Sequence, residues 1–163
     1  MVDIQLMPLV CEKGKIVVNK SIDRGYKINT LKLEKLLLLI NGYMLETNQK
    51  QFFETPIQIS KDGLRIPIIY KNFVANGIEF KEKFIEYVSL LDLEEEVVDM
   101  VLDCYGHLDS FELEELTPLK QITSSFAYTK EEEIPSSIFC GMFEKATEQK
   151  KTTAKKMVKS KSL

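Results

Sequence analysis

Apolar residues recur most regularly between Asn29 and Glu46, where the chain reads NTLKLEKLLLLINGYMLE. Their spacing of i, i+3, i+4, i+7 and i+11 is typical of one buried helix face. These positions are Leu33, Leu36, Leu37, Ile40 and Met44. Leu38 and Leu39 fill the opposite side, and an apolar run this short does not cross a bilayer, so protein must cover the helix on every side. The sequence predicts a central core helix capped by Asn29 or Thr30.

A second pattern, FFETPIQIS at residues 52–60, is rich in β-forming residues and predicts a strand. Pro56 interrupts the pattern, which limits the strand to a short or edge position. The Asp-Gly pair that follows predicts a turn, and Ile66 begins a short return strand. The sequence therefore predicts a small β-hairpin at about residues 52–67, followed by a helix over about 67–73 whose first turn suits a proline.

Shorter amphipathic segments predict the other helices. They cover much of residues 3–20, then 92–105, about 110–116, and about 134–146 from Ile134 or Pro135. Gly106 fits the end of the 92–105 helix, and Asp109 or Ser110 caps the next one. The pattern also predicts a turn at residues 23–25 and a loop at 119–133, and it leaves 78–84 open between a small strand and the lead into a helix.

Together these elements predict a mainly α fold, a compact helical bundle around one buried central helix with the small β-hairpin. The 163 residues suggest one domain, which we assign to residues 1–146, and a basic tail at 147–163 that we expect to be disordered. The three cysteines are widely spaced, odd in number and without a CxxC pair. This pattern favours a reducing cytoplasm over disulfides or a zinc site.

Charge is distributed unevenly along the chain. Residues 145–163 contain seven lysines and one glutamate, a charge of +6, so the remaining residues must carry −9 to give the net −3. An acidic body does not favour nucleic acid as its partner, whereas it suits a basic protein.

Few residues offer catalytic chemistry. His107 is the only histidine, and we expect it to be exposed between two helices. Glu95, Asp99 and Asp103 share one side of a helix and can in principle hold Mg²⁺, but they lie opposite the valines and should face water. Cys104 is expected in the core. The chain has no GxxxxGK[ST], GxGxxG or GxSxG motif, so we expect no catalytic residues, no cofactor and no metal.

Four segments in series carry a resemblance to a known family. NTLKLEKLLLLINGY (29–43) is similar to a family segment LTxLKLQKLLYFAQGW, and FFETPIQISKDGLRIPIIY (52–70) to a stretch that ends in GPVvpevY. VLDCYGHLDSFELEELT (101–117) is similar to vlxxYgxlsaxeLxxLT, and a final helix shares Ile134 and Pro135. The chain departs at Leu64-Arg65, where the family has Pro-Val, and lacks its Pro-Trp. The order of these features resembles the Panacea-domain family of SocA-like, phage-associated antitoxins.

The resemblance implies a non-enzymatic antitoxin that neutralises a cognate toxin, encoded by a neighbouring gene, through direct binding. One branch of that family also delivers the toxin to a protease, which makes a protease a second implied partner. We take the corner formed by Gly63, Arg65, Pro67 and Tyr70 as the candidate binding site, because tyrosine and arginine are frequent interface anchors. Residue chemistry alone favours the simpler interpretation of this corner as well packed.

Two alternatives remain open. The first is a prophage-associated, nucleic-acid-binding regulator whose binding is weakened by salt and uses the tail lysines. These are Lys150, Lys151, Lys155, Lys156, Lys159 and Lys161. The second is a small hydrolase, which requires His107 to be recessed beside Asp103 or Asp109. No membrane partner is expected, since no segment is apolar over the length of a bilayer.

Overall fold

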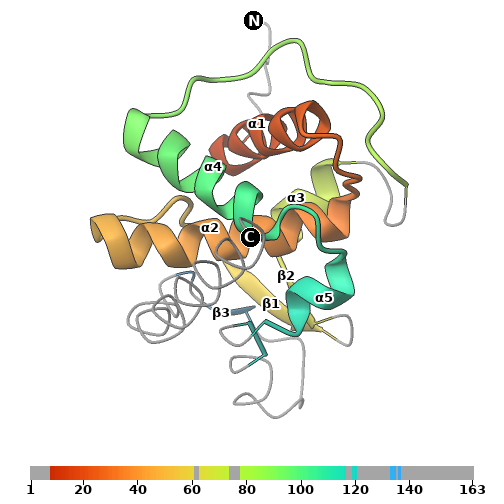
Figure 1. Ribbon diagram of the computed structural model, residues 1–163. Helices are drawn as coiled ribbons and strands as arrows, with labels where there is room; N and C mark the ends of the chain where they lie inside the picture. The colour runs from red at the N-terminus through yellow and green to blue at the C-terminus, as the bar shows by residue number, and fades with distance from the viewer. Residues whose placement is uncertain are drawn as a thin grey trace, which may run out of the picture.

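The computed structural model of the protein describes residues 8–60, 63–73, 78–116, 119–120, 133–134 and 136. Within these residues the fold is mainly α, with a small antiparallel sheet (Figure 1). The elements are α1 (Leu9–Asp23), α2 (Thr30–Asn48), β1 (Ile57–Ser60), β2 (Gly63–Arg65), α3 (Pro67–Asn72), α4 (Asp92–Tyr105), α5 (Ser110–Glu114) and β3 (Glu133–Ile134).

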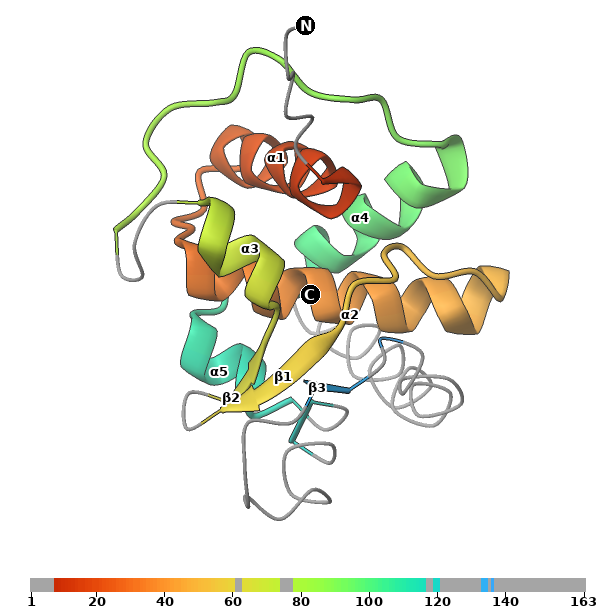
Figure 2. The same ribbon diagram turned by 180° about the vertical axis from the view of Figure 1, so that it is seen from behind.

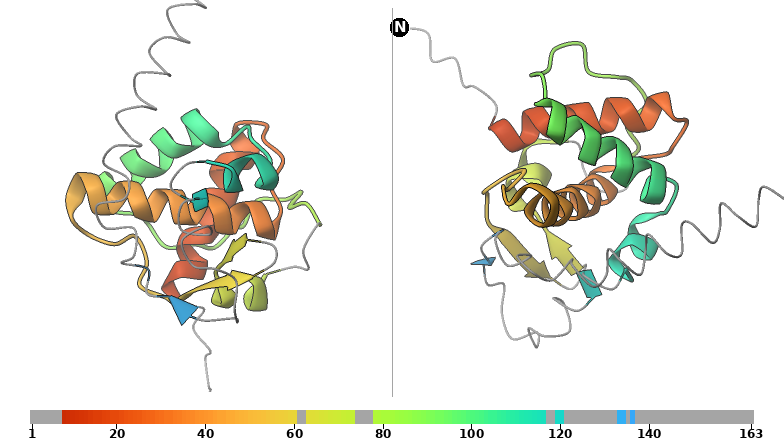
Figure 3. Two further views of the ribbon diagram at one scale, coloured as in Figure 1. Left: turned by 90° about the horizontal axis from the view of Figure 1, so that it is seen from below. Right: turned by 60° about the vertical axis from the view of Figure 1, so that its left-hand side comes forward.

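α2 is the predicted core helix, and it is buried on both of its sides. Leu33 and Leu37 are fully buried, and so is Leu38 on the opposite side. The Asn29 side chain caps the helix by accepting a hydrogen bond from the Lys32 N–H at 2.8 Å. Seen nearly end-on in the right-hand view of Figure 3, α2 has α1 and α4 on one side and the β1–β2 hairpin on the other. None of the described helices has both the length and the apolar character needed to cross a bilayer.

A hairpin is present as β1 and β2, with residues 61–62 outside the described residues. Its bounds differ from the prediction, because β1 begins only at Ile57 and the return strand β2 ends before Ile66, the residue expected to begin it. The strand order is β2-β1-β3, which makes β1 the central strand and not an edge strand. β1 tolerates this position because Pro56 precedes the strand and leaves its ladder intact. The pairing of Ile57 with Ile134 places Ile134 in a strand, so the prediction of a helix from that residue is wrong there. Of the rest of the predicted last helix, the structure describes only Ser136, which is buried.

The other helices follow their predictions closely. α1 ends at Asp23 and is followed by the predicted turn, in which Gly25 has a φ of +75°. α4 ends at Tyr105 with Gly106 as its C-cap, as predicted, and an added Cβ on Gly106 would lie 2.7 Å from the Tyr26 ring. α5 begins at its predicted cap, because the Asp109 carboxylate accepts a hydrogen bond from the Glu112 N–H at 2.8 Å.

Residues 78–91, which we call the strap, connect α3 to α4 across the outer side of α1 (Figures 1 and 2). Apart from one isolated bridge between Glu79 and Asn29, the strap has neither helix nor strand. Of the two alternatives left open for residues 78–84, a small strand is therefore wrong, and the segment instead belongs to the lead into α4. Its first half packs through Phe80 and Phe84, whose rings meet the Phe73 ring edge-on with centroids 5.8 Å away in each case. This aromatic cluster holds the strap against the helices.

Candidate functional site

The candidate corner is built around a buried ion pair between β2 and α2. The Arg65 guanidinium donates from Nε and Nη2 to the two carboxylate oxygens of Glu34, at 2.9 and 2.8 Å. The Ile66 N–H donates to the same carboxylate at 2.7 Å. Only 6% of Arg65 is exposed and none of Glu34, so this bidentate pair fixes β2 on the central helix.

A second buried pair holds the same strand from the other side. Lys35 lies 3.0 Å from the Glu114 carboxylate of α5 and also donates to the Leu64 carbonyl. The Leu64 N–H donates to Glu114 at 3.3 Å. Burial raises the pKa of Glu34 and lowers the pKa of Lys35, and in both cases the ionic partners only partly oppose it. Such charges are retained in a protein interior only where partners surround them.

The structure brings together the four residues predicted for the corner, but it turns the arginine inward. The Arg65 guanidinium lies 4.7 Å from the centre of the Tyr70 ring, and the Tyr70 hydroxyl donates to Gln58 at 3.2 Å. Pro67 begins α3 as predicted, and both Pro67 and Tyr70 are half-buried. These contacts match the interpretation of a well-packed corner, which presents little of Arg65 to a partner. The six tail lysines lie outside the described residues.

The acidic column on α4, formed by Glu95, Asp99 and Asp103, is at least partly exposed, but all three carboxylates form ion pairs. Asp99 accepts hydrogen bonds from Lys20 and Arg24 of α1, both at 2.9 Å. Glu95 pairs with Lys20 at 3.1 Å, and Asp103 pairs with Arg24 at 3.1 Å. The column therefore joins two helices and does not simply face water as predicted. Among the described residues, no group of three histidine, cysteine or acidic side chains is placed to hold a metal ion.

The remaining chemical candidates lie at the surface. Cys104 is exposed, which contradicts the prediction that it belongs to the core. It lies beside Asp103, outside the stripe that α4 buries. His107 is also exposed, at the rim of a cavity of about 360 Å³, and so does not meet the condition of recession that the hydrolase alternative requires.

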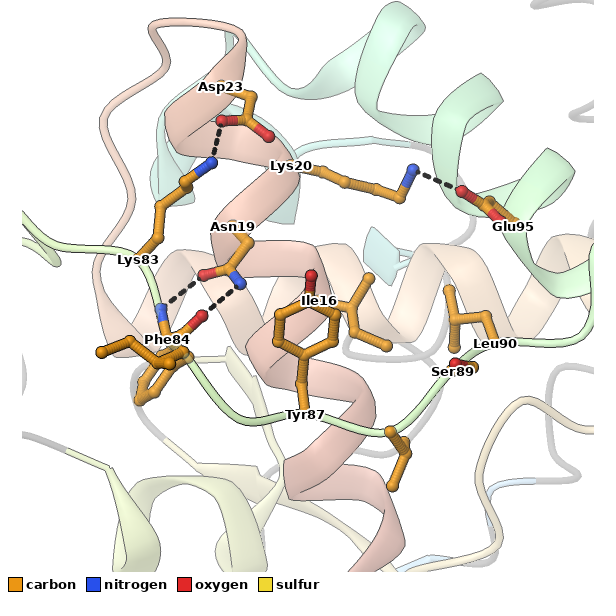
Figure 4. A pocket seen from close by; sticks show the side chains of 12 residues that line it. Ile16, Asn19, Lys20, Asp23, Lys83, Phe84, Tyr87, Ser89, Leu90 and Glu95 are labelled. Carbon is orange, nitrogen blue, oxygen red and sulfur yellow. Dashed lines mark hydrogen bonds and ion pairs between the residues drawn. The ribbon is translucent and has the colours of Figure 1, made fainter.

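A second cavity, of about 420 Å³, lies between the strap and α1 (Figure 4). Asn19 anchors the strap at its edge: its amide donates to the Phe84 carbonyl at 2.9 Å, and its side-chain oxygen accepts from the Phe84 N–H at 2.7 Å. Ile16 and Leu90 add apolar walls, and Tyr87 lines the cavity from the strap. Sequence reasoning missed Asn19, although an asparagine on an otherwise apolar helix face was an available signal.

Large apolar side chains are exposed mainly on the strap and the start of α4. Among the described residues, seven such side chains are exposed, and five of them fall between residues 78 and 93. These five are Ile78 (56%), Ile85 (94%), Tyr87 (54%), Leu91 (68%) and Leu93 (54%). Single exposed apolar residues are common, but a concentration of them in one segment is typical of an interaction surface.

Comparison of the chain with models of protein families, with curated proteins and with solved structures finds no match.

Proposed function

We propose that this protein is an antitoxin-like binding protein that neutralises a cognate toxin, the product of a neighbouring gene, by direct contact. The observation that carries the proposal is the concentration of exposed apolar side chains between residues 78 and 93. Apolar area that stays in contact with water contributes nothing to folding, whereas its burial against a partner is favourable. The order of sequence features that resembles the Panacea-domain family supplies the partner class.

Two further observations support the proposal. The residues before 145 carry a charge of −9, which suits a basic partner and disfavours nucleic acid. Cys104 is a free and exposed thiol, which fits the reducing cytoplasm where such a toxin would act. We also interpret the packing of the described helices around α2 as a compact helical bundle that serves as a rigid support for the strap.

The test is co-expression of the full chain with the product of each neighbouring gene. We expect one of these products to arrest growth alone, and growth to return when the chain is present together with a complex that co-purifies. The half-life of the toxin in the same cells distinguishes simple neutralisation from delivery to a protease, because only delivery shortens it. If no neighbouring product is both toxic and bound, the proposal is wrong.

A further inference from the structure

From Ile85 to Leu93, the exposed apolar residues stand among carboxylates. Residues 85–96 contain five acidic residues and no lysine or arginine. α1 neutralises two of the five, through the pairs Lys13–Glu94 at 2.7 Å and Lys20–Glu95 at 3.1 Å. The other three, Glu86, Asp92 and Glu96, are exposed and have no ion-pair partner among the described residues. A local charge of about −3 therefore remains at the surface near neutral pH.

The same stretch presents apolar anchors of the kind that interfaces use. Tyr87 and Leu91 are exposed by 54% and 68%, and both can bury large areas without moving the backbone. Tyr87 also lines the cavity of about 420 Å³ beside α1, which offers a partner side chain a recess between the strap and Ile16 (Figure 4). Aromatic anchors at the centre with charges at the rim are the usual composition of a protein interface.

We propose that this surface binds a basic segment of the toxin, an inference that rests on the proposed function. The surface, which we call the acidic strap face, consists of Ile85, Glu86, Tyr87, Leu91, Asp92, Leu93 and Glu96. Tyr87 and Leu91 bury their side chains against the partner, and the three unpaired carboxylates face its lysines or arginines. Charge complementarity selects this occupant, because nucleic acid and anionic lipid surfaces carry the same sign as the acidic strap face. The corner around Arg65 then supports the fold and stays outside the interface.

The test uses two pairs of matched variants in the full chain. Tyr87→Ser removes an apolar anchor on the strap, and Phe111→Ser removes a still more exposed apolar side chain from α5 (73% against 54%). Glu96→Lys reverses a charge on the strap face, and Glu115→Lys makes the same change beside α5, where the carboxylate has a surface partner in Lys120. α5 lies well away from the start of α4 (Figures 1 and 2). Circular dichroism and thermal unfolding of each variant verify that it folds.

The probe is the tagged product of the neighbouring gene that wild-type chain binds, measured by calorimetry at two salt concentrations. We expect Tyr87→Ser and Glu96→Lys each to weaken binding by about tenfold or more, with both α5 variants within about twofold of wild type. Wild-type binding should weaken between about 50 mM and 500 mM NaCl, and Glu96→Lys should reduce that dependence.

Three other outcomes would each contradict a different part of the proposal. If wild type binds and the strap variants bind equally well, the acidic strap face is not the binding site, and the antitoxin proposal stands. If the α5 variants lose as much affinity as the strap variants, the location is wrong. If wild type binds no neighbouring product, the proposed function fails and the partner assigned to this surface fails with it.

Discussion

At the scale of single residues, Gly63 is the position where local conformation and buried charge meet. Its φ of +88° is a conformation that residues with a Cβ resist, and an added Cβ would overlap the carboxylate of Glu114. That carboxylate cannot move aside freely, because it neutralises Lys35 in the interior. A side chain at position 63 would therefore strain the backbone and also displace the Glu114 carboxylate from Lys35.

We predict that Gly63→Ala lowers the free energy of unfolding by about 2–4 kcal/mol, as the sum of backbone strain and a disturbed buried ion pair. Gly25→Ala is the matched control, since Gly25 also has a positive φ but has open space around its Cβ position. The control should lose only about 1 kcal/mol. Denaturant unfolding measures both variants, and equal losses would show that Glu114 yields without cost.

The sequence predicted those residues whose role depends on near neighbours. Asn29 as a helix cap, Asp109 as the next cap and Pro67 in a first helical turn all follow from local rules. Their partners lie within a few positions along the chain. The pairing of Arg65 with Glu34 joins residues 31 positions apart, so the sequence brought Arg65 to attention as a possible anchor but not as a buried one.

At the scale of elements, five charged side chains of α1 and α4 form one ion-pair cluster around Asp99, in addition to the separate Lys13–Glu94 pair. Burial alone raises the pKa of Asp99, but hydrogen bonds from Lys20 and Arg24 outweigh it and leave the pKa below its ordinary value. A depressed carboxyl pKa stabilises the fold above the unfolded-state pKa of about 4, and this stabilisation disappears as pH falls through the folded-state value. The ion-pair cluster around Asp99 therefore contributes to stability at neutral pH, and acid removes this contribution.

We predict that Asp99→Asn lowers stability by less than about 1 kcal/mol between pH 5 and 9, because the carboxylate is partly exposed and water screens it. Thermal unfolding between pH 7 and pH 2 measures the effect, and the difference between the two proteins should shrink as pH falls through the lowered pKa of Asp99. Asp103→Asn, which removes a single contact from a more exposed carboxylate, should change less. A difference between Asp99→Asn and wild type that persists unchanged at pH 2 contradicts this account.

Helices and strands were predicted most accurately where apolar residues repeat over several turns. α2 and α4 repeat apolar residues over three or more turns, and their bounds agree with the sequence within a few residues. β3 has two residues and pairs with Ile57 from 77 positions away, so no local pattern signals it. The strap has no periodic pattern of apolar residues, and its course is defined by contacts with distant parts of the chain, such as Asn19 of α1, Asn29 and Phe73.

At the scale of the whole molecule, two buried asparagines hold extended chain against the helices. Asn19 on α1 binds both backbone groups of Phe84, and Asn41 on α2 accepts from the N–H groups of Phe52 and Phe53 at 2.6 and 3.2 Å. Each satisfies backbone groups that have no place in a helix or sheet. An asparagine on an apolar helix face signals a buried polar contact, but the sequence did not reveal the partner, because Phe84 lies 65 positions from Asn19 along the chain.

The strap should therefore open as a unit when its anchor is removed. We predict that Asn19→Ala accelerates hydrogen exchange at the Phe84 amide by about tenfold or more, because the N–H loses its partner while the fold around α2 persists. Asn41→Ala should instead accelerate exchange at Phe52 and Phe53 and leave Phe84 unchanged. The proposed binding of a toxin through the acidic strap face depends on this anchor, so Asn19→Ala should also weaken that binding more than Asn41→Ala does. Exchange that rises equally everywhere in both variants would mean that the molecule opens globally and that the strap has no independent stability.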